Sequence, residues 1–201
     1  MNILLAIIIG YLLGNINASY ILGKVFKGID IREEGTSNAG ASNAVIVMGW
    51  KFGAATFLID ALKAAVAMWI VKYITNGNTD LAVLAGVMAM VGHIYPVFMK
   101  FKGGKGIASI LGMMLGLNWF IALILYVTIV LGAVITNYLV IGELIILILF
   151  PVAVYLFGYS NFAVAIIIFA CLLSAYKLRE NFIRTFKGTE QKLSSVFPKK
   201  K

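Results

Sequence analysis

The chain has 201 residues, of which 62% are hydrophobic and 12% are charged, and its formal net charge is +9. This composition leaves too little polar surface for a water-soluble globular protein and indicates an integral membrane protein. Its one cysteine, Cys171, excludes an internal disulfide and a cysteine-based metal site. The positive charge favours anionic lipid and phosphorylated compounds over nucleic acid, because the basic residues flank apolar segments.

Long apolar segments recur along the whole chain. A helix of about 20 residues crosses a hydrocarbon core of about 30 Å, and these runs are continuous, without the alternation of a β-barrel. They cover residues 3–22, 52–71, 81–99, 107–135, 144–156 and 162–176. The sequence therefore predicts an all-α membrane helix bundle, organised as a single domain over residues 1–201.

The distribution of Lys and Arg predicts the orientation of the bundle. Basic residues follow the first run, follow the third run and fill the C-terminal tail, so we expect these three regions in the cytoplasm. The chain must then cross an even number of times between the third run and the tail. Gly112, Gly116 and Asn118 predict that the run 107–135 breaks near Leu117. Seven transmembrane helices follow, with the N-terminus outside and the C-terminus in the cytoplasm.

A glycine-rich loop, F-K-G-G-K-G, spans Phe101 to Gly106 between two apolar runs. Glycines allow successive backbone N–H groups to turn inward around an anion, and a helix starting at Ile107 would add its positive end. Lys102 and Lys105 supply charge. The loop is therefore a candidate phosphoryl site, and turn or packing glycines are the alternative. A Walker loop is excluded because Gly106 follows Lys105 where Ser or Thr is needed.

Two other polar segments are expected on the same membrane face. Residues 28–43 are rich in Gly, Ser, Thr and Asn, which suit an oxyanion or polyol site but also ordinary turns. Residues 177–190 form a basic segment, which a helix attracted to anionic lipid would also explain. We expect the three segments to converge.

Ionisable residues within the apolar runs are costly and therefore informative. Asp60 and Lys63 are three positions apart, so they share one helix face and can neutralise each other. They either brace the bundle or support an active site. His93, the one histidine, precedes the glycine loop and either bonds a backbone group or takes part in the chemistry.

Together these segments resemble the bacterial acyl-phosphate:glycerol-3-phosphate acyltransferase family, the PlsY family. The matching positions cover nearly the whole chain and are Asp30, Arg32, 35–43, Asp60, Lys63, His93, Pro96, 101–108, Asn181, Arg184 and 188–190. The resemblance implies a cell-membrane enzyme that moves a fatty acyl group from acyl phosphate, and not from acyl-CoA, to the 1-position of glycerol 3-phosphate. The products are lysophosphatidic acid and phosphate. We expect no cofactor or metal, and a monomer among membrane lipids.

The resemblance also implies the site residues. The catalytic residues would be Thr36, Lys105, Asn181 and Glu190. The substrate-binding residues would be Ser37, Asn38, Gly40, Asn43, His93, Gly103, Gly104, Gly106, Arg184 and Gly188. In this hypothesis the glycine loop binds the donor phosphate, and Thr36, Asn38 and the tail residues order the acceptor and the neighbouring loops. The donor's own phosphate serves as the base.

Four positions depart from the family pattern. Thr36 stands where the family usually has Ser, Ser37 where it has Gly, Ile46 where it has Arg, and Leu178 where it has His. Thr36 keeps the hydroxyl, but Ile46 cannot replace the bidentate phosphate contact of an arginine. These changes leave open a different acceptor or weaker activity. Two further alternatives are a transporter of phosphorylated compounds and a catalytically silent binder.

Overall fold

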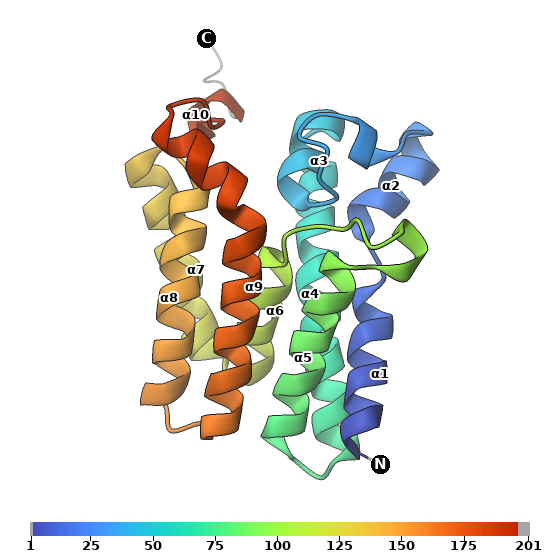
Figure 1. Cartoon of the computed structure of the whole chain (residues 1–201), viewed down its shortest axis with the longest axis vertical. Helices are drawn as coiled ribbons and strands as arrows, with labels where there is room; N and C mark the ends of the chain where they lie inside the picture. The colour runs from blue at the N-terminus through green and yellow to red at the C-terminus, as the bar shows by residue number, and fades with distance from the viewer. Residues whose placement is uncertain (1, 197–201) are drawn as a thin grey trace. The chain divides into compact units, whose positions relative to one another are not determined.

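The structure is a computed structural model that describes residues 2–196. Within these residues the secondary structure is helical throughout (Figure 1). The α-helices are α1 (Asn2–Gly14), α2 (Ala18–Lys27), α3 (Ala41–Met48), α4 (Trp50–Ile74), α5 (Thr79–Ile94), α6 (Ile107–Leu117), α7 (Trp119–Thr136), α8 (Leu139–Leu156), α9 (Asn161–Phe186) and α10 (Leu193–Val196). Two short 3₁₀ helices are η1 (Ile31–Glu33) and η2 (Val97–Met99).

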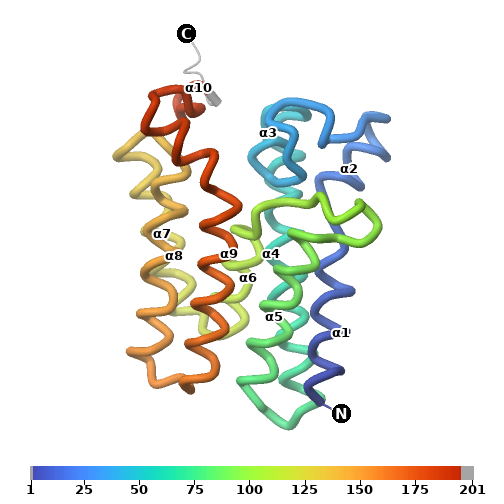
Figure 2. Tube along the Cα trace, in the orientation of Figure 1, coloured from blue at the N-terminus to red at the C-terminus, as the bar shows by residue number. Residues whose placement is uncertain are grey.

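The chain divides into two compact units at the junction of α6 and α7. In the first unit, α1 packs along α5, and α4 packs against α1, α5 and α6. The trace in Figure 2 shows α2, α3 and the segment that follows η2 gathered at one end of these helices. In the second unit, α8 packs against both α7 and α9. The single-domain expectation stays a prediction.

Small residues allow the long helices of the first unit to pack closely. A Cβ at Gly10 or Gly14 of α1 would collide with the carbonyl oxygen of Ala85 or Ala89 of α5. Gly112 of α6 meets Ala61 of α4 in the same way. Lipid removes the hydrophobic driving force between helices, so close van der Waals packing at small residues holds such bundles together.

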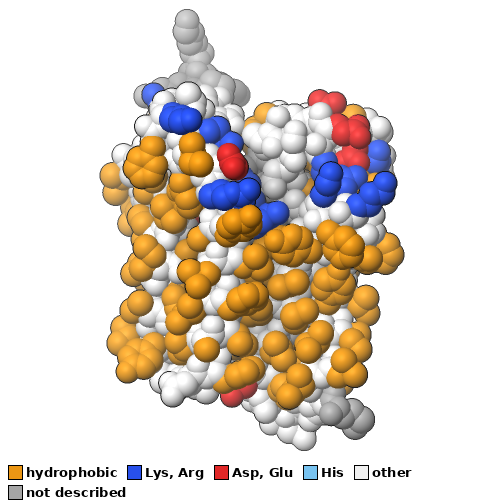
Figure 3. All heavy atoms as spheres, viewed as in Figure 1, with side chains coloured by type: hydrophobic (Ala, Val, Ile, Leu, Met, Phe, Trp, Pro, Cys, Tyr) orange, Lys and Arg blue, Asp and Glu red, His pale blue; other side chains and the backbone are white. Residues whose placement is uncertain are grey.

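In the part of the chain described, six segments are long and apolar enough to cross a membrane. They cover Asn2–Lys27, Trp50–Ile74, Thr79–Met99, Trp119–Thr136, Leu139–Leu156 and Asn161–Phe186, and α6 is a shorter apolar helix. Large apolar side chains are exposed along them, and Figure 3 shows this apolar surface below the basic side chains around α2. The chain is therefore a multi-span integral membrane protein, as predicted.

The predicted break in the run 107–135 is confirmed. α6 ends at Leu117 and α7 starts at Trp119. Asn118 lies between them and accepts hydrogen bonds from the N–H groups of Phe120, at 2.8 Å, and Ile121, at 3.3 Å. Such a cap satisfies N–H groups that have no partner within their own helix.

The first apolar run does not form one continuous helix. The helix breaks between α1 and α2 at Asn15, Ile16 and Asn17. Asn17 caps α2 by accepting a hydrogen bond from the N–H of Tyr20 at 3.1 Å. A side chain that competes for backbone hydrogen bonds favours a helix end over a helix interior.

Candidate active site

The loop after α2 is held in shape by Asn43, a fully buried side chain of α3. Its Oδ1 accepts from the N–H of Thr36 at 2.8 Å, and its Nδ2 donates to the carbonyls of Ile31 and Glu34 at 2.9 and 3.0 Å. Both ends of the amide are thus engaged within the loop. Thr36 and Ser37 themselves are exposed, and Ser37 adopts a positive φ of 55°.

An ion pair joins this loop to the segment that leads into the glycine loop. Arg32 contacts Asp30 through Nε and Nη2, at 2.9 and 2.6 Å. The third guanidinium nitrogen of Arg32, Nη1, donates to the carbonyl of Met99 in η2 at 2.8 Å. The hydrogen bonds from Arg32 hold the pKa of Asp30 below its ordinary value, and the same contact raises the pKa of Arg32.

The end of α1 and the linker between α1 and α2 also hold this segment. Asn15 Oδ1 accepts from the N–H of Val97 at 2.7 Å, and the Tyr11 hydroxyl donates to the carbonyl of Tyr95 at 2.9 Å. Asn17 Nδ2 donates to the carbonyl of Ala39 at 3.2 Å. The helix break therefore anchors both loops of the first unit.

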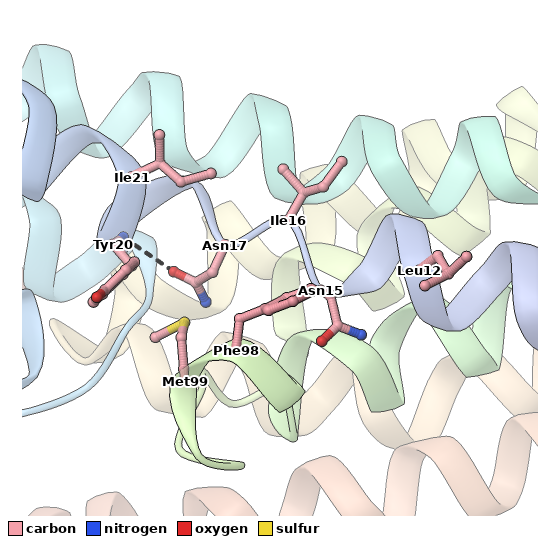
Figure 4. A pocket seen from close by; sticks show the side chains of 8 residues that line it. All are labelled: Leu12, Asn15, Ile16, Asn17, Tyr20, Ile21, Phe98 and Met99. Atoms are coloured by element: carbon pink, nitrogen blue, oxygen red, sulfur yellow. Dashed lines mark hydrogen bonds between the residues drawn. The ribbon is translucent and has the colours of Figure 1, made fainter.

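A pocket of about 260 Å³ opens beside this linker. Figure 4 shows its lining, with Phe98 and Met99 of η2 facing the α1–α2 linker. The eight lining residues are Leu12, Asn15, Ile16, Asn17, Tyr20, Ile21, Phe98 and Met99. Both asparagines use their oxygens in the hydrogen bonds described above, so the wall that remains is largely apolar.

The glycine loop lies where it was predicted, between η2 and α6, and α6 starts at Ile107 as expected. Its backbone is arranged differently. The N–H groups of Gly103 and Gly104 donate to the carbonyls of Ile94 and His93, both at 3.1 Å. These two groups therefore satisfy the C-terminal end of α5. The expectation that they form an anion-binding nest is wrong.

The donors suited to an anion lie further along, at the start of α6. The first N–H groups of an α-helix have no partner within that helix, and its positive end favours negative charge. The first backbone bond of α6 runs from the N–H of Ile110 to the carbonyl of Gly106 at 2.9 Å. Lys105, which is partly buried, comes directly before this turn. Gly106 has a φ of 91°, which glycine adopts without strain.

Three ionisable side chains are buried below the glycine loop. Lys63 Nζ lies 2.7 Å from Asp60 Oδ1, 3.0 Å from His93 Nδ1 and 2.6 Å from the carbonyl oxygen of Ile16. Their relative exposures are 0% for Asp60, 6% for Lys63 and 2% for His93. A Cβ on Gly104 would collide with His93 Nε2 and lie 3.0 Å from the carbonyl oxygen of Ala39.

The tail residues form a separate cluster in the second unit. Glu190 accepts from Asn181 Nδ2 through Oε1 and from Arg184 Nε through Oε2, both at 2.7 Å. The N–H groups of Thr189 and Glu190 donate to the carbonyl of Arg184, at 2.9 and 3.2 Å. The chain turns back at Gly188, whose φ is 68°. Two of the predicted catalytic residues, Asn181 and Glu190, are thus in direct contact.

The structure brings some of the predicted site residues into contact within each unit. In the first unit, Gly104 and His93 meet near the Ala39 carbonyl, and Asn38 Nδ2 lies 2.8 Å from the position of a Cβ at Gly40. The prediction that the tail joins them stays a prediction. Among the departures from the family pattern, Ile46 is 39% exposed and Leu178 is 1% exposed. Within residues 2–196, no group of three His, Cys, Asp or Glu residues is placed to hold a metal ion.

Sequence reasoning missed the contribution of Asn15 and Asn17. Both were counted within an apolar run, yet they are buried and anchor the two loops. The signal that was available is a pair of asparagines two positions apart inside a membrane span, where unsatisfied amides are costly.

Comparisons with known proteins agree with this architecture. The family described as glycerol-3-phosphate acyltransferase matches residues 4–188. The glycerol-3-phosphate acyltransferase 1 of Oceanobacillus iheyensis is 39% identical over 100% of this chain and 99% of its own length. The glycerol-3-phosphate acyltransferase of Thermotoga petrophila is 37% identical over 93% of this chain and 94% of its own.

Solved structures give the same result. The crystal structure of PlsY, an integral membrane glycerol 3-phosphate acyltransferase, in its glycerol 3-phosphate form superposes with a TM-score of 0.90. The two sequences are 29% identical, and the match covers 98% of this chain and 100% of that one. The lysophosphatidic acid form gives a TM-score of 0.88 at 28% identity, and the match covers 98% of each chain.

Proposed function

This chain belongs to the glycerol-3-phosphate acyltransferase family, and from that premise we propose that its acyl donor is an acyl phosphate and not acyl-CoA. The reaction transfers a fatty acyl group to glycerol 3-phosphate and gives lysophosphatidic acid, a step of phospholipid synthesis. In the proposal the acyl group goes to the 1-position and inorganic phosphate is released.

The observation that carries the donor assignment is the position of Lys105 directly before the first turn of α6. A cation beside helix N–H groups that have no partner within their own helix suits a compact phosphoryl group. An acyl phosphate is already activated, so the chain needs to align two anionic substrates rather than supply a nucleophile. The acceptor hydroxyl attacks the acyl carbon, the bond to the phosphate oxygen breaks, and the departing phosphate takes the hydroxyl proton.

Each predicted site residue except His93 has a role in this proposal. Lys105, with Gly106 and the start of α6, holds the donor phosphate, while Gly103 and Gly104 shape the loop. Thr36, Ser37, Asn38 and Gly40 order the acceptor, and Asn43 keeps their loop in place. This assignment is supported by the full engagement of the Asn43 amide within the loop. Asn181, Arg184, Gly188 and Glu190 shape the turn of the tail, and their part in ordering the acceptor stays a prediction.

We also propose the topology predicted from the charge distribution. Seven segments cross the bacterial cell membrane, with the N-terminus outside. They are the six long apolar segments, in which α1 and α2 form one crossing, and the shorter helix α6. The two loops of the first unit then lie at the cytoplasmic face, where glycerol 3-phosphate is dissolved. The protein acts as a monomer. Cysteine labelling of Lys102→Cys and Asn76→Cys, each combined with Cys171→Ala so that one cysteine remains, tests this, because the first should react only from the inside and the second only from the outside.

The pocket between η2 and the α1–α2 linker is our candidate for the acyl chain. It is largely apolar and is continuous with the residues that lead into the glycine loop. Leu12→Trp should fill it and shift the preference toward shorter acyl chains, whereas Leu4→Trp, on the same helix but outside the pocket lining, should not. Equal chain-length profiles for both variants would remove this pocket from the proposal.

The decisive experiment is mass spectrometry of the products made by the purified protein. Glycerol 3-phosphate is supplied with acyl phosphate in one reaction and with acyl-CoA in the other. We expect lysophosphatidic acid only with acyl phosphate, together with one phosphate per product. Product from acyl-CoA would overturn the donor assignment. Exchange of labelled glycerol 3-phosphate across sealed vesicles without any acyl product would favour a transporter instead.

A further inference from the structure

The acyl transfer described above makes no use of Asp60 and Lys63, although burying charges inside a membrane protein is costly. A pair that only braced the bundle would be expected to satisfy both carboxylate oxygens. Asp60 Oδ2 has no hydrogen-bond partner among the residues that the structure describes. Buried ion pairs contribute little to stability even when they are well satisfied. Bracing of the bundle therefore does not explain why this pair is buried.

The contacts of Lys63 determine the tautomer of His93. An ammonium group has three N–H donors and no acceptor. Lys63 Nζ has three acceptors within reach, the Ile16 carbonyl, Asp60 Oδ1 and His93 Nδ1. His93 Nδ1 lies 3.0 Å from Lys63 Nζ but 3.5 Å from Asp60 Oδ1. Nδ1 therefore presents its lone pair to the ammonium, and the ring proton is on Nε2.

The opposite edge of the same ring supports the glycine loop. His93 Nε2 occupies the space that a Cβ of residue 104 would need. The His93 carbonyl accepts the N–H of Gly104 at 3.1 Å, so one residue holds this glycine through both its backbone and its ring. Lys105, the proposed phosphate ligand, is the next residue. A shift of the ring is therefore passed to Lys105 through a single peptide unit.

We infer that Asp60 and Lys63 are positioning residues for the acyl transfer. Asp60 orients Lys63, and Lys63 holds His93 as its neutral Nε2–H tautomer with the ring edge against Gly104. The ring then sets the position of Lys105 and of the first turn of α6. Lys63 also bonds the Ile16 carbonyl, so one ammonium joins the α1–α2 break to the glycine loop. This inference rests on the proposed role of Lys105.

The tautomer can be measured directly, because His93 is the one histidine of the chain. ¹⁵N-histidine labelling of the full-length protein in detergent or nanodiscs gives one pair of ring signals. We expect an unprotonated Nδ1 signal and a protonated Nε2 signal in the unliganded wild type near neutral pH. An Nδ1–H tautomer or a doubly protonated ring would overturn the inference, whatever the donor substrate proves to be.

The functional consequence is tested with a charge-neutral pair of substitutions. Asp60→Asn with Lys63→Met removes both charges and leaves no unpaired buried carboxylate. We expect this double variant to lose the wild-type ¹⁵N pattern. Its kcat/KM should fall at least about tenfold, since a displacement of about 1 Å at the site can lower the rate about 100-fold. Lys72 is an exposed lysine of the same helix, and Lys72→Met should change neither the ¹⁵N pattern nor kcat/KM.

Two outcomes separate this inference from the proposed function. If Lys105→Ala is inactive while the double variant keeps wild-type kcat/KM with an altered ¹⁵N pattern, the positioning role is overturned. If Lys105→Ala is fully active, the proposed phosphate site fails instead. Gly104→Ala provides an independent test of the ring contact. Its loss of activity should be smaller in a His93→Ala background, where the colliding ring is absent, and an unchanged loss would contradict the contact.

Discussion

Arg32 donates a hydrogen bond from Nη1 to the carbonyl oxygen of Met99 at 2.8 Å, and the two residues are 67 positions apart. Arg32 belongs to the loop after α2, and Met99 ends the 3₁₀ helix that leads into the glycine loop. The bond therefore connects the proposed acceptor loop with the proposed donor loop. Asp30 holds the guanidinium in the orientation that this contact needs.

Arg32→Ala removes this connection and leaves the Asp30 carboxylate without its partner. A hydrogen bond to a charged group is worth about 1.5–3 kcal/mol, and we expect a loss of stability of that order together with a raised KM for glycerol 3-phosphate. Thermal unfolding in detergent and steady-state kinetics measure the two effects. Lys72→Ala, an exposed position at the end of α4, should stay within about 0.5 kcal/mol of wild type. A wild-type KM for Arg32→Ala would show that the loops do not depend on this bond.

The same ion pair predicts an acid-dependent component of stability. The pKa of Asp30 is lowered in the folded protein, chiefly by its hydrogen bond with Arg32. Its stabilising contribution is therefore complete above the ordinary Asp pKa of about 3.9 and is lost as the pH falls through the lower folded value. Melting temperatures measured in detergent from pH 6 down to pH 3 should decline less steeply below pH 4 for Asp30→Asn than for wild type. Parallel curves would contradict the assignment.

Lys105→Ala should abolish acyl transfer. One well-placed donor to a developing charge is worth about 2.7–4 kcal/mol, or about 10²–10³ in rate, and the loss of a full charge at the phosphate should be at least as costly. Phosphate release by the purified protein measures it. Lys102→Ala, an exposed lysine of the same loop, is the matched control and should lose far less. Equal activities of the two variants would remove Lys105 from the site.

Glu190 was predicted to be catalytic, yet both of its carboxylate oxygens contact neighbouring side chains, Asn181 and Arg184. Glu190→Gln keeps an acceptor for Arg184 Nε and offers its NH₂ as a donor to Asn181 Oδ1 once the Asn181 amide rotates, so we expect it to retain activity within about threefold of wild type. Glu190→Ala removes the carboxylate that accepts from Asn181 Nδ2 and Arg184 Nε, and it should lose about tenfold or more. The kcat/KM values of the two variants, measured at equal concentrations of folded protein, show whether Glu190 acts through its hydrogen bonds or through its charge. If both lose activity equally, the charge of Glu190 is needed for the chemistry itself.

The sequence was sufficient for the helices whose ends carry local signals. The break at Leu117 was predicted because Gly112, Gly116 and Asn118 interrupt an apolar run and because the charge distribution required an additional turn. Asn118 then caps α7 through its own side chain. A capping interaction of this kind is local, since the residues that make it are adjacent in the chain.

The break at Ile16 carries a local signal in Asn15 and Asn17, which the apolar composition of the run concealed, and contacts that are distant in sequence hold it in place. Its exposed carbonyl is satisfied by Lys63, 47 positions away. The orientation of the glycine loop was unpredictable for the same reason. The position of the loop and the start of α6 follow from composition. The N–H groups of Gly103 and Gly104 turn toward α5 because the carbonyls of Ile94 and His93, at the end of that helix, have no partner within it. Tertiary partners decide such details, and local pattern does not contain them.

Restoring the family arginine at position 46 should increase activity. Ile46 lies on α3 and is already 39% exposed, so a longer charged side chain can be accommodated there without displacing the core. A bidentate arginine contact with a phosphate is strong and directional, and we expect Ile46→Arg to raise kcat/KM for glycerol 3-phosphate by about tenfold, which corresponds to about 1.4 kcal/mol. Ile46→Gln is the uncharged control. Leu178→His, the other family residue, should instead lower the melting temperature, because Leu178 is 1% exposed and a buried polar ring without a partner is costly. An unchanged or reduced kcat/KM in Ile46→Arg, with the fold intact, would show that this chain binds its acceptor without a charge at position 46.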